Sequence, residues 1–217
     1  MLIAVTRAVS PTLGNCELTH RARVPIDIAK AESEHAAYEE TLRSLGVTVV
    51  RAPAEPTLPD AVFVEDAGLV LDEVAVITRS AAVSRRPETE SLTQVLARYR
   101  PLVQIEAPAT LDGGDVLLVG RTVYVGLASR TNREAIAQLE TVLEEWDYEV
   151  QPVPVSGCLH LKSAVTQVGD NLLLLNDRFV RPDCFGPMQR VTVAPEEPDG
   201  ANALWVNGAA VYPMHHP

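Results

Sequence analysis

Three carboxylates stand close together in one short segment of the sequence, where they could hold a cation. Asp60, Glu65 and Asp66 lie around the Pro59 turn and a short apolar run, immediately before a stretch of β-strand character. Carboxylates accept paired hydrogen bonds, which suits a planar cation such as a guanidinium. An ordinary interpretation is also open, in which Asp60 caps the turn and Glu65 pairs with a surface arginine.

Two later segments carry polar residues at the corresponding point. Asp112 and Asp115 flank two glycines in one of them, and His160 lies between two leucines in the other. A histidine changes charge near neutral pH and can exchange protons, although a histidine in an apolar run is often a hydrogen-bonded core residue. The question of function therefore becomes what these three turns hold between them.

The elements that must position these turns are predicted to be β-hairpins. Strand-like runs meet at tight polar turns in residues 67–78, 116–126, 164–175 and 203–211. The last hairpin turns at Asn207-Gly208, which is the strongest short hairpin signal. The spacing of the hairpins is typical of a repeated supersecondary unit.

Amphipathic helices are predicted between the hairpins. The first ends at Gly46, and residues 47–50 then form a buried strand. Pro87 can begin a second helix, and Thr131 or Asn132 can cap a third. Successive units of hairpin, helix and strand around a common axis would bring the starts of the hairpins together, as in propellers. The predicted buried face of the first helix consists of Ile28, Ala31, His35, Tyr38, Leu42 and Leu45.

Composition and charge exclude several classes of protein. The chain has 217 residues, of which 47% are hydrophobic and 22% charged, as in a globular protein with a real core. A net charge of -11 disfavours nucleic acid and anionic membranes as partners and favours small cations. We expect a cytoplasmic protein, because no stretch has the length of a membrane span and the N-terminus lacks a signal-peptide pattern. Cys16, Cys158 and Cys184 lack the spacing of a disulfide framework or a zinc site.

Four segments resemble, in order, the signature segments of dimethylarginine dimethylaminohydrolase. They are Leu58-Pro-Asp-Ala-Val-Phe-Val-Glu-Asp66, Leu111-Asp-Gly-Gly-Asp-Val116, Ser129-Arg-Thr-Asn132 and Gly157-Cys-Leu-His-Leu-Lys-Ser163. The resemblance implies the pentein fold, an α/β propeller of five ββαβ units, formed here by residues 1–217 as one domain with the last blade truncated. It also implies hydrolysis of methylated arginine to citrulline and dimethylamine or methylamine, with no cofactor and no metal.

The resemblance assigns the guanidinium end of the substrate to the first acidic segment. Asp60, Glu65 and Asp66 would contact the guanidinium, and Phe63 would form an apolar wall beside it. The partner is therefore expected to be a small cationic amino acid, a methylated arginine.

Other residues receive roles at the amino-acid end of the substrate. Arg85 and Arg130 resemble the pair that grips the α-carboxylate, a task suited to the guanidinium fork, and Arg86 could replace Arg85. Leu18 resembles a lid residue that offers its backbone carbonyl to the α-amine. A solvated surface arginine is the ordinary alternative for both Arg85 and Arg130.

The resemblance makes His160 and Asp112 the catalytic residues. His160 would protonate the departing amine and then take a proton from the water that resolves the intermediate. Asp112 would hydrogen-bond to the imidazole and orient it, whereas Asp115 would cap its own turn.

The nucleophile of the family has no counterpart in this sequence. Its members attack the guanidinium carbon with a cysteine near the C-terminus, which gives a covalent thiouronium intermediate. This chain ends at Met214-His-His-Pro217, after the last hairpin, and Cys158 would lie beside His160 rather than opposite it. We therefore expect a truncated, inactive or impaired hydrolase.

Several alternatives remain open at this point. A metal-dependent hydrolase could use the same carboxylates and histidine, although no helical histidine pair is present. Arginine deiminase or an amidinotransferase would share the acidic pocket. A nucleophile-less binding protein for methylarginine, or a scaffold such as the ribosome anti-association factor of this architecture, would need no thiol. The sequence is compatible with a homodimer and does not determine the oligomeric state.

Overall fold

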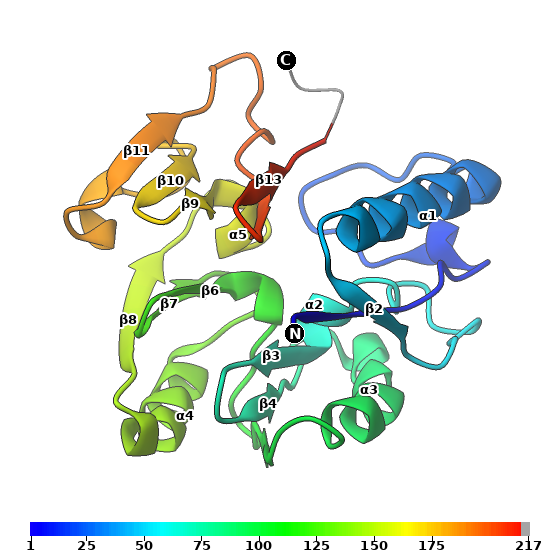
Figure 1. The fold of residues 1–217 in the computed structure, drawn as a ribbon, viewed down its shortest axis with the longest axis horizontal. Helices are drawn as coiled ribbons and strands as arrows, with labels where there is room; N and C mark the ends of the chain where they lie inside the picture. Colours follow the sequence, from blue (N-terminus) through cyan, green and yellow to red (C-terminus); the bar gives the residue numbers. More distant parts are fainter. Residues whose placement is uncertain (214–217) are drawn as a thin grey trace.

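The computed structural model describes residues 1–213 and contains five β-sheets that follow one another along the chain. Helices α1 (Ile28–Ser44), α3 (Glu88–Leu96) and α4 (Arg133–Leu143) lie at the periphery, whereas the short helices α2 (Val64–Ala67) and α5 (Leu161–Ala164) lie nearer the middle (Figure 1). The expectation of a truncated last blade concerns the segment Met214-His-His-Pro217, which lies outside the described residues.

Three of the sheets repeat one unit, an antiparallel hairpin followed by a helical segment and a third strand parallel to the second. The hairpins predicted in residues 67–78, 116–126 and 164–175 are thereby confirmed. The third unit has the 3-10 helix η5 (Pro182–Phe185) where the others have α3 and α4. The strands are β3 (Gly68–Val70), β4 (Ala75–Ile77), β5 (Leu102–Gln104), β6 (Val116–Val119), β7 (Thr122–Leu127), β8 (Glu149–Pro154), β9 (Val165–Gly169), β10 (Leu172–Leu175) and β11 (Gln189–Thr192).

The first and last sheets have two strands each in the described part of the chain. Strand β1 (Ile3–Thr6) runs parallel to β2 (Thr48–Arg51), with α1 between them in the sequence. Strands β12 (Leu204–Val206) and β13 (Ala209–Val211) form the fourth predicted hairpin, with φ of 47° at Asn207 and 78° at Gly208. Positive φ at both turn residues is the geometry that Asn-Gly favours. Besides α2, α5 and η5, the described residues contain four short 3-10 helices: η1 (Leu13–Asn15), η2 (Val83–Arg85), η3 (Gly113–Asp115) and η4 (Glu144–Trp146).

Helix α1 ends as predicted but buries a different face. Gly46 follows it with φ of 79°, which only glycine adopts without strain. Of the predicted apolar face only Leu42 is buried, while Tyr38 is 38% exposed. Glu39 is fully buried instead, because its carboxylate accepts hydrogen bonds from Thr6 on β1 and from Arg51 on β2. Periodicity of apolar residues cannot reveal a buried charge of this kind.

The core lies between the helices and the sheets of the repeated units. On α4, Leu139 and Leu143 are fully buried against Val123 and Val125 of β7. Asn132 caps this helix, since its side chain accepts the amide of Ala135, which decides between the two caps that the sequence offered. In residues 1–213 no helix combines the length and apolar character required to cross a bilayer.

Replacement of Leu139 by alanine tests this core. The side chain has no exposed surface, so the change removes buried methyl groups and leaves a cavity, which lowers the free energy of unfolding by about 3 kcal/mol. Denaturant titration followed by circular dichroism measures the loss. Glu140→Ala, on the exposed side of the same helix, should change the free energy by less than ~0.5 kcal/mol. Equal effects of the two variants would contradict this packing.

Candidate active site

Three short helical turns meet to form the site. Helices α2, η3 and α5 each end at the residue before the first strand of a hairpin. A Cβ on Gly113 would lie 1.9 Å from the carbonyl oxygen of Glu65, and one on Gly114 would lie 2.9 Å from the ring of His160. The two glycines are therefore needed because the three turns approach more closely than any side chain would permit.

Asp66 is the central carboxylate of the site. It is 8% exposed, and its Oδ1 accepts the Gly114 amide at 2.9 Å and lies 3.9 Å from Nε2 of His160. Its Oδ2 accepts Nη1 of Arg85 at 2.8 Å. Burial opposes the charge on Asp66, but Arg85, His160 and the Gly114 amide together outweigh it and lower the pKa of this carboxyl. Asp66 therefore stays ionised although it is buried.

His160 contacts a different aspartate from the one that the sequence indicated. Its Nδ1 lies 3.4 Å from Oδ2 of Asp115. Asp115 in turn accepts the Leu161 amide at 3.0 Å and the hydroxyl of Thr131 at 2.7 Å, so its carboxylate is fixed on both sides. The turn of η3 directs Asp115 towards α5, and the orienting role expected of Asp112 stays a prediction.

The surroundings of His160 favour its protonated form. Burial acts against the charge, but the neighbouring carboxylates of Asp115, Asp66 and Asp112 outweigh it and raise the pKa of the imidazole. The charged histidine therefore stabilises the folded state below its ordinary pKa. That contribution is lost as the pH rises through the higher, folded-state pKa.

Asp112 and Arg130 form a second polar group deeper in the site. Asp112 has no exposed surface, and within residues 1–213 neither of its carboxyl oxygens has a hydrogen-bond partner of standard geometry, although Ser80 lies close enough to act on its pKa. Nη1 of Arg130 lies 3.7 Å from Asp112 and is likewise without a hydrogen-bond partner. Burial raises the pKa of Asp112. Buried polar groups without partners are rare in folded proteins and are found at functional sites.

The segment predicted to act as a lid touches the site through one backbone amide and one side-chain hydroxyl. The amide of Glu17 donates to both carboxyl oxygens of Asp60, at 3.0 and 3.3 Å, and the hydroxyl of Thr19 accepts Nη2 of Arg130 at 3.3 Å. Leu18, between them, is 40% exposed. Burial raises the pKa of Asp60, so its charge costs stability in the folded protein.

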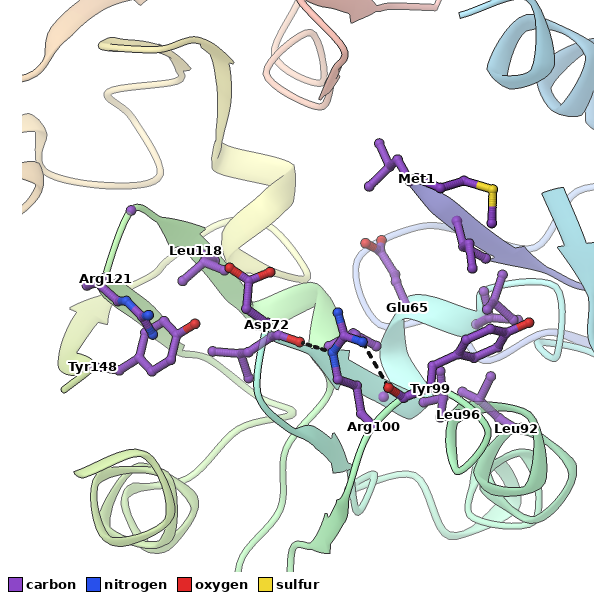
Figure 2. A pocket seen from close by; sticks show the side chains of 18 residues that line it. Met1, Glu65, Asp72, Leu92, Leu96, Tyr99, Arg100, Leu118, Arg121 and Tyr148 are labelled. Atoms are coloured by element: carbon purple, nitrogen blue, oxygen red, sulfur yellow. Dashed lines mark hydrogen bonds between the residues drawn. The ribbon is translucent and has the colours of Figure 1, made fainter. Parts of the chain in front are cut away.

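Two of the predicted binding residues lie further out. Phe63 is 48% exposed, and Glu65 faces Lys162 at 2.8 Å. Glu65 also borders a cavity of about 690 Å³ that is lined by residues of β1, β3 and α3 and by the end of β6 with its following turn (Figure 2). Met1 and Leu118 line the same cavity on either side of Glu65 (Figure 2). The structure thus brings Asp60, Asp66, Asp112, Arg85, Arg130 and His160 into one buried network and leaves Leu18, Phe63 and Glu65 at its margin.

The comparisons with known proteins agree on one family. The family model described as N,N dimethylarginine dimethylhydrolase, eukaryotic, matches residues 18–183. A dimethylarginine dimethylaminohydrolase of Streptomyces coelicolor is 39% identical over 207 residues, which cover 95% of this chain and 79% of that relative. The chain belongs to the dimethylarginine dimethylaminohydrolase family.

Two solved structures of dimethylarginine dimethylaminohydrolase superimpose on the whole chain. The Pseudomonas aeruginosa enzyme, as a cysteine-to-serine mutant complexed with citrulline, has a TM-score of 0.92 and 32% identity, with 100% of this chain and 85% of that chain covered. A histidine-to-glycine mutant in an adduct with S-methyl-L-thiocitrulline has a TM-score of 0.94 and 33% identity, with the same coverage. The mixed α/β fold that the resemblance implied is thereby confirmed.

Membership of the dimethylarginine dimethylaminohydrolase family does not by itself identify every residue that shapes the site. Thr131 was expected only as a possible helix cap, Asp115 only as a cap of its own turn, and Glu88 had no predicted role. Glu88 follows Arg85 by three residues, a spacing that places the two on one face of a helical turn. Thr131 lies inside a signature segment, but its contact with Asp115 depends on the packing of two loops.

Replacement of Asp115 by asparagine tests the contact with His160. The loss of the nearest carboxylate charge should lower the pKa of His160, since this group contributes the largest opposing interaction to burial. Nuclear magnetic resonance titration of the imidazole protons measures the shift. Asp112→Asn is the matched comparison and should shift the pKa less. A larger shift in Asp112→Asn would support the predicted orienting role of Asp112.

Proposed function

We propose that this protein binds a methylated arginine at the three turns and that its site serves hydrolysis to citrulline and dimethylamine or methylamine. The observation that carries the proposal is a group of three buried carboxylates, with Asp66 and Asp112 close to His160 and Asp60 close to Arg85. A permanently charged guanidinium would compensate this excess of negative charge. The relatives support the substrate class, since one of their structures holds citrulline.

The proposed roles follow from the geometry of the turns. Asp66 is ionised and aligned by Gly114, so it accepts one edge of the guanidinium, and Asp60 accepts another with Phe63 and Glu65 at the entrance. Nη1 of Arg130 makes no hydrogen bond within residues 1–213, so Arg130 is suited to the α-carboxylate, and Leu18, the neighbour of Thr19, would offer its carbonyl to the α-amine. The resemblance to the family gives Arg85 the same task of binding the substrate α-carboxylate. In this structure, however, its guanidinium group donates hydrogen bonds to Asp66 and Glu88.

His160 is proposed as the proton-transfer residue. A thiolate would attack the guanidinium carbon, and the amine would leave with a proton from the imidazolium. Water would then attack the thiouronium carbon and give its proton to the neutral imidazole. Citrulline and the thiol would result from this second step. The raised pKa of His160 supports the first step, because it favours the protonated imidazole.

The cysteines of the described residues favour a second candidate function, which is binding without turnover, because they are poorly suited to act as the nucleophile. Cys158 is the cysteine next to His160 in the sequence, and its Sγ donates to the carbonyl oxygen of His160 at 3.4 Å. Burial raises the pKa of this thiol to about 11, so it is protonated and a weak nucleophile at neutral pH. Cys184 packs against the hydrophobic cluster around Phe185, and the Cys16 carbonyl accepts a hydrogen bond from Arg23.

The proposed function also requires a particular arrangement of the sheets. We propose that the five sheets are the blades of a pentein propeller, with α2, η3 and α5 at the inner ends of three of them. The repeated unit of hairpin, helix and parallel strand supports this proposal. We place the protein in the cytoplasm as part of the same proposal.

Replacement of Asp60 by asparagine separates binding from folding. The variant keeps an acceptor for the Glu17 amide but loses a charge, so affinity for asymmetric dimethylarginine should fall about tenfold, or ~1.4 kcal/mol. The melting temperature should stay equal or rise, because the raised pKa shows that the buried charge is unfavourable in the folded state. Isothermal titration calorimetry and thermal melts provide the two readouts.

The control for this experiment is Asp170→Asn in the exposed turn between β9 and β10. It makes the same change of charge far from the three turns and should leave affinity unchanged. Equal affinities of the wild type and Asp60→Asn would contradict the binding role of Asp60.

Citrulline release decides between the two candidate functions. We expect the 217-residue chain to bind asymmetric dimethylarginine and to release no citrulline beyond the background of a His160→Gln variant. Colorimetric detection of citrulline and intact-mass analysis of a trapped adduct measure turnover and thiouronium formation. Turnover that is lost in Cys158→Ser would make Cys158 the nucleophile and contradict the assignment given above.

A further inference from the structure

A buried ion pair lies directly behind the site. Nε and Nη2 of Arg85 donate to the two carboxyl oxygens of Glu88 at 3.0 and 2.9 Å, which is the paired geometry that arginine favours. Arg85 is 6% exposed and Glu88 is 2% exposed. The same Arg85 donates Nη1 to Asp66, so one guanidinium joins Glu88 to the central carboxylate of the site.

We propose that Glu88 is a positioning residue, which holds Arg85 so that Arg85 in turn fixes Asp66 under the Gly114 amide and beside His160. The inference rests on the proposed function, since it concerns the same guanidinium site. In this proposal Arg85 holds protein groups in place. Two of its guanidinium nitrogens, Nε and Nη2, bind Glu88 and not the substrate.

The geometry leaves Asp66 little freedom to move. Its Oδ1 accepts the Gly114 amide at 2.9 Å, while a Cβ on Gly114 would lie 2.7 Å from the same oxygen. Arg85 fixes the other carboxyl oxygen at 2.8 Å. If Glu88 released Arg85, this second anchor would rotate, and Asp66 would lose its alignment.

Charge balance gives Glu88 a second effect. Asp66, Arg85 and Glu88 together carry one negative charge, so the group attracts a cation. Neutral glutamine at position 88 would leave Asp66 and Arg85 with no net charge beside the site. Attraction for a guanidinium and for the protonated form of His160 would then decrease, because both face the same buried, weakly screened group.

A further buried arginine holds the backbone around this pair. Arg7 has no exposed surface and donates to the carbonyl oxygens of Glu88 and Ala61 and to the hydroxyl of Ser91. It thereby connects the first turn of α3 to the turn that carries Asp60. The position of Glu88 is thus fixed through its backbone, which leaves its side chain free to hold Arg85.

Glu88→Gln tests the proposal, with Glu90→Gln as the matched control on the exposed side of the same helix. In the ligand-free protein, Glu88→Gln should lower the pKa of His160 by about half a pH unit and shift the Gly114 amide resonance. The other charged groups that face His160 are Asp66, Asp112 and Asp115, and they are unchanged. Affinity for asymmetric dimethylarginine should fall about fivefold. Glu90→Gln should behave as the wild type in all three measurements.

Identical His160 titrations and affinities for Glu88→Gln and Glu90→Gln would overturn the proposal, even if Glu88→Gln melted earlier. Glu88→Asp keeps the charge and should recover affinity to within about twofold. If Glu88→Gln does not fold, Arg85→Lys replaces it, since lysine cannot hold Glu88 with two parallel bonds while it contacts Asp66. An Arg85→Lys protein with wild-type titration and affinity would also overturn the proposal. If the wild type binds no dimethylarginine, the proposed function fails, while the ligand-free titration still decides the role of Glu88.

Discussion

The hydrogen bond from the Gly114 amide to Asp66 is the contact on which the site depends. It brings the turn before β3 against the turn before β6, and the space left between them admits only glycine at positions 113 and 114. His160 reaches Asp66 and Asp115 only because those two turns are in contact. A side chain at either glycine would separate the carboxylates from the imidazole, and the network would lose its shared environment.

Negative charge concentrated out of water is the second constraint. Asp60, Asp66, Asp112 and Asp115 are all buried, and within residues 1–213 their main compensating cations are Arg85, Arg130 and protonated His160. The effects differ from group to group. Arg85 lowers the pKa of Asp66, whereas burial raises those of Asp60 and Asp112. A site of this kind is less stable than an apolar core of the same size and is suited to a cationic ligand.

The repeated unit explains why residues distant in the sequence converge. Each of α2, η3 and α5 stands at the entrance of a hairpin whose second strand pairs with a later parallel strand. Helices α3 and α4 cover the outside of their units, so the turns at the other end are directed inwards (Figure 1). The scaffold is apolar and regular, and the chemistry lies in the short irregular turns at its inner end.

The sequence by itself determined the hairpins and the longer helices between them. Polar turns such as Asn207-Gly208 fixed the hairpins, and Gly46 and Asn132 fixed the limits of helices, because these signals act over a few residues. The signature segments also determined the family and most of the candidate residues. Only the tertiary structure decided their contacts: that Asp115 faces His160, that Glu88 holds Arg85, and that Glu39 is buried where an apolar face was predicted. Such contacts depend on ångström-scale distances between separate turns, and local spacing in a sequence does not contain that information.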